Sequence, residues 1–228
     1  MDVEPSFAAL GALIGVPARA NILSALFDGR AKTATELAMA AGITSQTTSS
    51  HLEKLLRAEL LVVEQHGKFR YYRIASPQVA EALEPLTLLS PHRPTPVRVN
   101  KNEAMGIHRA RYCYDHVAGR LGVALTAAMV ESGHLAEGER DYAITERGQA
   151  FFEMLGVDLT NVKGQRRVLA RKCLDWSERK PHVSGALGAA VAAVLISSGW
   201  IRRAQTGRQV IVTNKGKKAL AQHFGIKC

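Results

Sequence analysis

Four residues in the second half of the chain have side chains suited to metal or redox chemistry, and they form two cysteine–histidine pairs. Cys113 precedes His116 by three positions, and Cys173 precedes His182 by nine. Two thiolates and two imidazoles make up the ligand set of a tetrahedral zinc site, and either residue type can be an axial ligand of haem iron. The sequence therefore offers zinc or haem as a cofactor if the fold brings the pairs together.

The same residues support two other interpretations. Cys113 and Cys173 could form a reversible disulfide, with their thiol pKa values lowered by the nearby Arg111, Arg171 and Lys172. Alternatively, the histidines cap or pack helix starts and the cysteines act as small apolar residues. Because the spacing lacks the regularity of a CxxC motif, the metal, redox and structural roles all stay open here.

The two pairs belong to an internal repeat. Residues 116–122 (HVAGRLG) match residues 182–188 (HVSGALG) at an offset of 66, and the match continues beyond a hairpin that is two residues longer in the second copy. Each copy is predicted to contain a helix, a glycine turn, a hairpin and a helix capped by Thr145 or Thr213. The copies, about 113–158 and 179–226, are half winged helices that could pack about a pseudo-twofold axis.

The repeat also bears on an uncharged stretch of membrane-span length, residues 183–201. Its counterpart in the first copy carries Arg120 and Glu131, so we predict a buried helix and no membrane partner. The apolar stretch 7–16 follows Asp2 and Glu4 in place of the positive residues of a signal peptide, which we therefore exclude.

Composition and charge divide the chain into two parts. It has 228 residues, 46% of them hydrophobic, and its three cysteines indicate a reducing, cytoplasmic location. Three prolines in residues 90–96 predict a linker over 90–100, between domains 1–89 and 101–228. Residues 1–96 contain 9 basic and 9 acidic residues, whereas residues 97–228 contain 21 and 11, which is the whole net charge of +10.

Basic residues crowd one segment of the second part. This segment is predicted as a solvated face, or as a surface for flanking DNA phosphates or an anionic effector. At helical spacing Arg167 shares a face with its basic neighbours four positions away. The segment contains Lys163, Arg166, Arg167, Arg171, Lys172, Arg179 and Lys180.

The first part has the pattern of a helix-turn-helix followed by a β-hairpin. Apolar spacing predicts a helix over 18–27, and Thr33 with Glu36 has the form of a capping box for a short helix over 34–41. Gly42 supplies a turn, and Thr44 or Ser45 caps a polar helix that runs to about residue 58. A hairpin over 60–74, with basic residues at its tip and second strand, and a helix over 78–89 follow.

Residues 15–85 resemble the winged-helix domain of the ArsR/SmtB bacterial repressors. The matching stretches are Pro17–Leu23, Thr35–Ala38, Ser49–Leu55 and Gly67–Tyr72. The resemblance implies a symmetric homodimer that binds a double-stranded operator and leaves it when an effector binds. It places the DNA-reading surface on Ser45, Gln46, Thr47, Ser49, Ser50, His51 and Lys54, with Lys68 and Arg70 at the wing. We interpret His51 as a packing or phosphate-binding residue rather than a base-reading one.

The chain departs from the family pattern in three places. Glu59 stands where a glycine usually precedes the hairpin. The helix over 35–41 has no cysteine, so the arsenic-type site is missing. The helix after the wing offers Glu81 and Glu84 but no histidine, so the zinc-type site of that helix is missing too.

These observations together predict a mainly α fold with small β-hairpins (α+β). A winged helix-turn-helix is followed by two pseudo-symmetric winged-helix-like half repeats that sense an effector or add dimer contacts. The expected function is a homodimeric transcriptional repressor released by a metal or haem, thiol oxidation or a small anionic ligand. The alternatives are a DNA-architectural protein without effector and, with less support, an enzyme fused to a winged helix. No phosphate loop, nucleophile elbow or HExxH motif is present, so we predict no catalysis.

Overall fold

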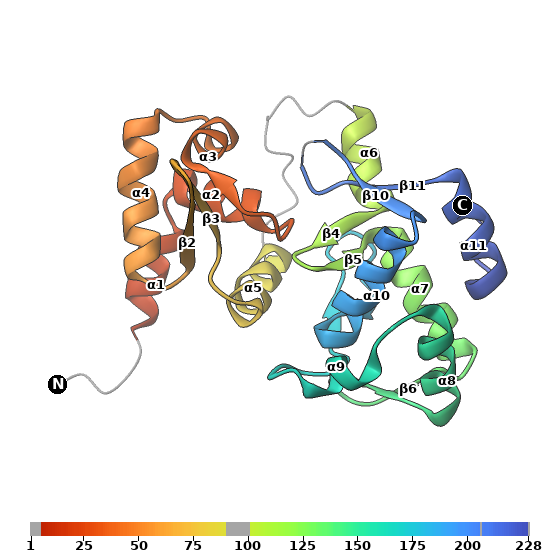
Figure 1. The fold of residues 1–228 in the computed structure, drawn as a ribbon. Helices are drawn as coiled ribbons and strands as arrows, with labels where there is room; N and C mark the ends of the chain where they lie inside the picture. Colours follow the sequence, from red (N-terminus) through yellow and green to blue (C-terminus); the bar gives the residue numbers. More distant parts are fainter. Residues whose placement is uncertain (1–5, 90–100, 206, 228) are drawn as a thin grey trace. The chain divides into compact units, whose positions relative to one another are not determined.

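The computed structural model describes residues 6–89, 101–205 and 207–227. The chain divides into two compact units, residues 1–83 and 84–228, which are described separately (Figure 1). The predicted linker over 90–100 lies outside the described residues. The helix expected over 78–89 is split: an α-helix ends at Leu83, and residues 84–89 form a 3-10 helix, η1 (Glu84–Leu89), that belongs to the second unit.

The helices of the first unit follow the predicted helix-turn-helix order. Thr33 forms the predicted capping box, since its Oγ1 accepts a hydrogen bond from the Glu36 amide and a Glu36 carboxylate oxygen accepts one from the Thr33 amide. Gly42 ends that helix in the left-handed conformation, which turns the chain into the next helix. The helices are α1 (Phe7–Ile14), α2 (Pro17–Leu26), α3 (Ala34–Ala41), α4 (Ser45–Arg57) and α5 (Pro77–Leu83).

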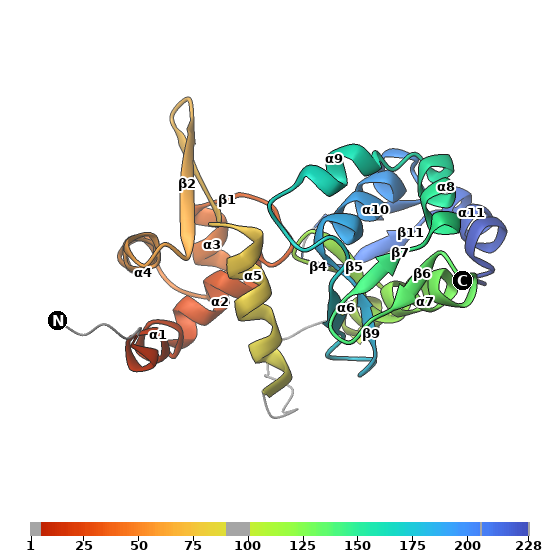
Figure 2. The ribbon, with the colours of Figure 1, turned by 90° about the horizontal axis from the view of Figure 1, so that it is seen from below.

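A three-stranded antiparallel sheet completes this unit. Its strands are β1 (Lys32–Thr33), β2 (Leu61–His66) and β3 (Phe69–Ile74), in the order β1-β3-β2. The predicted hairpin is confirmed, whereas the two-residue strand β1 carried no sequence signal. The β2–β3 hairpin extends beyond the helices as a wing (Figure 2). The apolar sides of α2, α3 and α4 pack into a core whose most buried members include Ile22, Leu37, Leu55 and Ile74.

The second unit contains two series of elements in the same order. The first series is β4 (Arg111–Cys113), β5 (His116–Ala118), α7 (Gly119–Glu131), β6 (Leu135–Glu137), β7 (Tyr142–Ile144) and α8 (Glu146–Leu155). The second is β8 (Lys172–Leu174), β9 (Pro181–Val183), α10 (Gly185–Ser197), β10 (Ile201–Arg203), β11 (Val210–Val212) and α11 (Asn214–Phe224). Helix α6 (Lys101–Arg109) precedes the first series, and α9 (Leu159–Gly164) joins the two.

Equivalent positions of the two series have equivalent local structure. Thr145 and Thr213 both cap a helix, each accepting a hydrogen bond at 2.9 Å from a glycine amide three residues later. The opening hairpins β4–β5 and β8–β9 were not predicted. They place His116 and His182 in strands, so neither histidine caps a helix as one interpretation expected.

The two series are interleaved. Helix α7 packs against β9 of the second series, and α10 packs against β5 of the first. The opening hairpin of each series also hydrogen-bonds to the closing hairpin of the other: the Tyr112 amide donates to the Arg208 carbonyl at 2.8 Å, and the Tyr142 amide to the Ala170 carbonyl, next to β8, at 2.7 Å. One continuous core therefore includes residues of both series, with Leu125, Met129, Leu187 and Leu195 among them.

Two glycines allow α7 and α10 to lie close against the histidine-bearing strands that precede them, β5 and β9. A Cβ on Gly122 would stand 2.3 Å from the Val117 carbonyl oxygen, and one on Gly188 would stand 2.6 Å from that of Val183. The second Cβ would also lie 3.2 Å from Cβ of His116. These positions therefore exclude any side chain, and they lie directly over the two histidine-bearing strands.

The uncharged stretch over 183–201 forms α10, a 13-residue helix whose residues are mostly buried in the second unit. Among the residues that the structure describes, no single helix has the length and hydropathy to cross a membrane. The bent pair α1 and α2, with 84° between its helices, passes such a test when the two are taken together.

Candidate nucleic-acid interface and cysteine–histidine cluster

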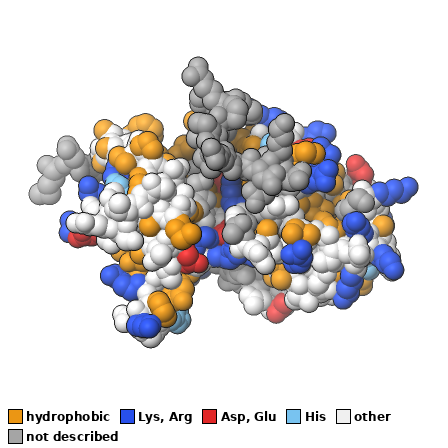
Figure 3. Space-filling view, turned by 90° about the horizontal axis from the view of Figure 1, so that it is seen from above, with side chains coloured by type: hydrophobic (Ala, Val, Ile, Leu, Met, Phe, Trp, Pro, Cys, Tyr) orange, Lys and Arg blue, Asp and Glu red, His pale blue; other side chains and the backbone are white. Residues whose placement is uncertain are grey.

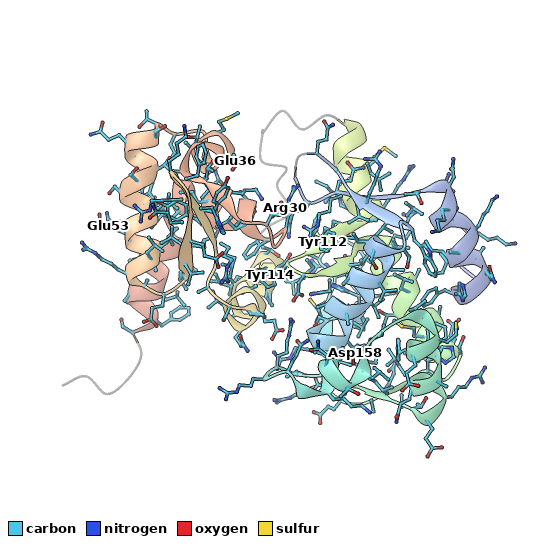
Figure 4. All side chains as sticks on the ribbon, viewed as in Figure 1. Arg30, Glu36, Glu53, Tyr112, Tyr114 and Asp158 are labelled. Carbon is cyan, nitrogen blue, oxygen red and sulfur yellow. The ribbon has the colours of Figure 1, made fainter. Side chains whose placement is uncertain are left out.

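Helix α4 presents the predicted DNA-reading residues on its exposed side. Thr48, Leu52 and Leu55 are buried and fix the helix to the core of the first unit. Glu53 and Arg57 form an ion pair along the helix surface, where Figure 4 labels Glu53. The exposed predicted residues are Ser45, Gln46, Thr47, Ser49, Ser50 and Lys54.

The start of α4 orients some of these side chains. The hydroxyl of Thr44 accepts a hydrogen bond from the Thr47 amide and also contacts the Thr47 hydroxyl, at 2.9 Å. The hydroxyl of Ser49 donates to the Ser45 carbonyl at 3.0 Å. The hydroxyls of Thr47 and Ser49 can still accept a hydrogen bond, so these two residues suit contacts with hydrogen-bond donors on DNA. Gln46 brings both a donor and an acceptor, as base edges require.

His51 is half-buried beside this surface, and its Nδ1 atom has no hydrogen-bond partner among the described residues. Burial, together with the charges of Arg19 and Lys54, lowers the pKa of His51 below its ordinary value. These effects favour the neutral imidazole, which fits a packing role.

The wing carries two exposed basic side chains near its tip. Lys68 lies over the ring of Phe69 and Arg70 over the ring of Tyr72. Arg73, on the same strand, has a different environment because it pairs across the hairpin with Glu64 at 2.8 Å. Lys68 and Arg70 are thus the better placed of the three for phosphate contacts.

Most of the basic segment of the second unit is exposed, as expected of a solvated face, but the segment does not form one helix face. Helix α9 ends at Gly164, so Arg167 and Arg171 do not share a helix face. Arg167 is largely buried and pairs with Asp115, and Lys172 pairs with Glu137 at 3.5 Å. Lys and Arg side chains occupy several separate places on the face shown in Figure 3.

The four cysteine and histidine residues converge in the interior of the second unit. One ligand atom from each lies within 4.8 Å of those from the other three. The Sγ atoms of Cys113 and Cys173 are 3.8 Å apart, and the Nε2 atoms of His116 and His182 are 3.1 Å apart. Three of the residues are buried and Cys173 is half-buried.

Strand register explains why unequal spacings lead to equivalent places. Cys113 is directly opposite His116 in the β4–β5 hairpin, and Cys173 is directly opposite His182 in the β8–β9 hairpin. Directly opposed residues project from the same face of a hairpin. The second hairpin has one further pair, Leu174 opposite Pro181, and a loop four residues longer, which together account for the spacings of three and nine.

An aspartate supports each histidine from the side away from the cluster. Asp115 lies 3.2 Å from Nδ1 of His116, and Asp175 lies 3.7 Å from Nδ1 of His182. Each aspartate is paired with an arginine that lies outside its own opening hairpin: Asp115 with Arg167 and Asp175 with Arg111, the latter at 2.9 Å.

Sequence reasoning did not connect these four charged residues with the histidines, although it named Arg111 and Arg167 for other roles. Asp115 adjoins His116 and Asp175 lies two residues after Cys173, a signal that could have found both aspartates. Burial opposes ionisation of Asp175, but the hydrogen bond from Ser177 and the charge of Arg111 hold its pKa below the ordinary value.

Glu84 is a further residue of the cluster that sequence reasoning did not place there. Its carboxylate accepts a hydrogen bond from Sγ of Cys113 at 2.8 Å and pairs with Arg208. Glu84 is 29 residues away from Cys113 in the sequence, in η1, so no local pattern connects the two.

The two thiols differ in acidity. The hydrogen bond with Cys173, burial and the charge of Glu84 raise the pKa of Cys113. The hydrogen bond with Cys113 lowers the pKa of Cys173, and His116 and His182 add to this effect against the opposing effect of burial. Burial disfavours the charged form of His116, but the hydrogen bonds with Asp115 and Cys173 prevail and raise its pKa to about 9. The pKa of Cys173 is thus lowered as expected and that of Cys113 is not, and the main causes are thiol, imidazole and carboxylate neighbours rather than Arg111, Arg171 and Lys172.

Comparisons with known proteins agree with the winged-helix geometry. A family model described as "Helix-turn-helix domain" matches residues 15–64. The HTH-type transcriptional regulator YdfF of Bacillus subtilis (strain 168) is 40% identical over 225 residues, which is 99% of this chain and 100% of YdfF. The similarity to this relative therefore extends over both units.

The solved structures that match cover smaller shares of the chain. The cadmium metal-sensor CMTR of Mycobacterium tuberculosis is 30% identical, covering 41% of this chain and 100% of that one, with a TM-score of 0.32. NolR of Sinorhizobium fredii is 26% identical, covering 36% and 81%, with a TM-score of 0.33. This chain belongs to the family of HTH-type transcriptional regulators that includes YdfF, as its resemblance to the ArsR/SmtB winged-helix domain predicts.

Proposed function

We propose that the protein is a homodimeric repressor that binds a palindromic operator through α4 and the wing and is released when the second unit senses an effector. The observation that carries this proposal is the exposed polar side of α4, held on a buried apolar side next to a basic wing. A helix of this kind fits the major groove while the wing reaches the phosphate backbone. We place the protein in the cytoplasm, where a bacterial operator would be bound.

In this proposal the second unit has a regulatory role rather than a catalytic one. Its interior is a packed core around the cysteine–histidine cluster, and the ligand atoms of that cluster are surrounded by their own side-chain partners. A catalytic metal site keeps one position open for water or substrate, whereas four protein ligands close it.

The test begins with selection of bound duplexes from a random DNA library by the purified full-length chain. We expect enrichment of a sequence with dyad symmetry, bound by two chains. The double variant Gln46→Ala, Ser49→Ala should lose at least tenfold in affinity for the selected duplex and change little on unrelated DNA, because each lost base contact costs about 1–3 kcal/mol of discrimination.

The matched control is Gln222→Ala, which removes an exposed glutamine from the second unit. It should leave both affinities unchanged. Equal losses on selected and unrelated DNA for the α4 variant would contradict base reading by these residues and favour an architectural protein. Binding of one chain per operator would contradict the dimer.

A further inference from the structure

The geometry points to a closed tetrahedral Zn²⁺ site in the second unit, formed by Sγ of Cys113, Nε2 of His116, Sγ of Cys173 and Nε2 of His182. This inference concerns the second unit alone, so it stands or falls independently of operator binding.

The separations of the ligand atoms match a zinc tetrahedron. Zinc–sulfur bonds of about 2.3 Å and zinc–nitrogen bonds of about 2.0–2.1 Å imply edges of roughly 3.8 Å between two sulfurs and roughly 3.3 Å between two nitrogens. The structure has 3.8 Å between the cysteine sulfurs and 3.1 Å between the histidine nitrogens. The sulfur–nitrogen separations are at most 4.8 Å, against an edge of roughly 3.6 Å in the tetrahedron, so side-chain shifts of up to about 1 Å would complete the coordination shell.

The surroundings of the histidines select Nε2 as the ligand atom. Each Nδ1 points toward an aspartate, and such a carboxylate accepts the Nδ1 proton and leaves the Nε2 lone pair for a metal. Nδ1 of His182 is buried and has no hydrogen-bond partner among the described residues. A carboxylate oxygen of Asp175 lies 3.7 Å from it. A small rotation of the ring on metal binding would bring that pair into hydrogen-bond distance.

The positions of the four ligands in the two series show which parts of the chain the metal would join. Cys113 and His116 come from the first series, and Cys173 and His182 from the second. A single ion bound to all four would join the opening hairpins of the two series. Because ligands that are apart in the unfolded chain meet only after folding, the binding free energy of the metal adds to the stability of the unit.

Haem and a resting disulfide fit the geometry less well. Haem iron takes at most two axial protein ligands, one on each side of the porphyrin, which would leave two of these four residues unused. The mutual approach of all four ligand atoms within 4.8 Å leaves no slot for the ring plane. The two cysteines are free thiols at 3.8 Å, against about 2.05 Å in a disulfide.

Cobalt is the probe for the experiment, since tetrahedral Co²⁺ bound to thiolate and imidazole absorbs visible light whereas Zn²⁺ does not. The full-length chain is stripped of metal by a chelator in the presence of a phosphine reductant and titrated with Co²⁺. We expect visible bands that saturate at one Co²⁺ per chain, sulfur-to-cobalt charge-transfer bands, and complete displacement by one equivalent of Zn²⁺. Zn²⁺ should also raise the unfolding temperature of the second unit, followed through Trp176 and Trp200, which both lie in that unit.

Substitutions of the proposed ligands test whether they produce the tetrahedral Co²⁺ spectrum. Cys173→Ser and His182→Gln should abolish the tetrahedral spectrum, and the matched control His223→Gln, a histidine stacked on Trp200 outside the cluster, should keep it. Asp115→Asn should keep the spectrum but weaken Co²⁺ binding about tenfold, as loss of a supporting carboxylate does.

Failure of the folded, reduced wild-type chain to bind Co²⁺ would overturn the proposal, whatever the variants do. An octahedral spectrum, or one that survives in Cys173→Ser, would overturn it as well. Oxidation of the two cysteines to a disulfide by air while Zn²⁺ is present in excess would show a redox pair instead.

Discussion

The Sγ atoms of Cys113 and Cys173 lie 3.8 Å apart although 60 residues separate them in the sequence. The Nε2 atoms of His116 and His182 are still closer, at 3.1 Å across 66 residues. Each cysteine is opposite its histidine in a hairpin, and the two hairpins meet where the two series of the second unit are interleaved. The cluster is therefore a product of tertiary packing between two locally similar pieces.

Glu84→Gln is expected to tighten metal binding at the cluster. The carboxylate of Glu84 accepts a hydrogen bond from Sγ of Cys113, and its negative charge opposes the thiolate that a metal requires. A glutamine removes the charge and can donate an N–H to the thiolate, so Kd for Co²⁺ should fall about tenfold. Competition with a chromophoric chelator measures this Kd. Glu139→Gln, at an exposed site, is the control, and a Kd that is unchanged or higher in Glu84→Gln would contradict the assigned role of the carboxylate.

Gly188→Ala should destabilise the second unit by about 1–3 kcal/mol, the usual cost of overpacking. The added Cβ would meet the Val183 carbonyl oxygen at 2.6 Å and Cβ of His116 at 3.2 Å. Denaturant unfolding followed by tryptophan fluorescence reports on this unit. Gly164→Ala provides the matched control, since nothing lies within 4 Å of a Cβ there. Equal stability of the two variants would show that α10 can move away from the histidine-bearing strand without cost.

Glu59→Gly should stabilise the first unit. Glu59 has a φ of +56°, in the left-handed region where a side chain costs about 1–2 kcal/mol. Glycine removes that cost but gains more freedom in the unfolded chain, so a net gain of roughly 0.5–1 kcal/mol is expected. Far-ultraviolet circular dichroism follows the unfolding, with Ala58→Gly as control, because Ala58 has a φ of −88° and should only lose stability. A loss in Glu59→Gly would mean that the Glu59 side chain stabilises the turn by contacts of its own.

Replacement of the wing cations should change the salt dependence of DNA binding more than its sequence preference. Lys68→Ala and Arg70→Ala should each reduce the slope of log K against log salt by about 1, on operator and unrelated DNA alike. Arg73→Ala should reduce it less, because Glu64 already neutralises Arg73 across the hairpin. Titrations at four or more salt concentrations measure the slopes. An Arg73 slope change equal to the other two would contradict this ranking.

The sequence predicted the elements whose signals are local. The capping box of Thr33 and Glu36 and the threonine caps of α8 and α11 are set by residues three positions apart, and all were found where expected. Glu59 was recognised as a departure from the family's glycine, and the structure shows it in a backbone conformation that glycine favours.

What could not be predicted depends on residues far apart in the chain. The opening hairpins have strands of three residues, too short for a periodic pattern, and their register alone makes the spacings of three and nine equivalent. Glu84 reaches Cys113 across 29 residues, and Arg111 reaches Asp175 across 64. Repetition at an offset of 66 suggested that His116 and His182 correspond, but only packing brings them together.

The interleaving of the two series has a consequence for the order of events during synthesis. Helix α7 cannot bury its apolar side until β9 has left the ribosome, and the hydrogen bond from β4 to the Arg208 carbonyl waits for the β10–β11 hairpin. At about 5–20 residues per second, the first unit would be complete many seconds before the second can close. A nascent chain would thus have a folded first unit, and exposed cysteines, well before its second unit can fold.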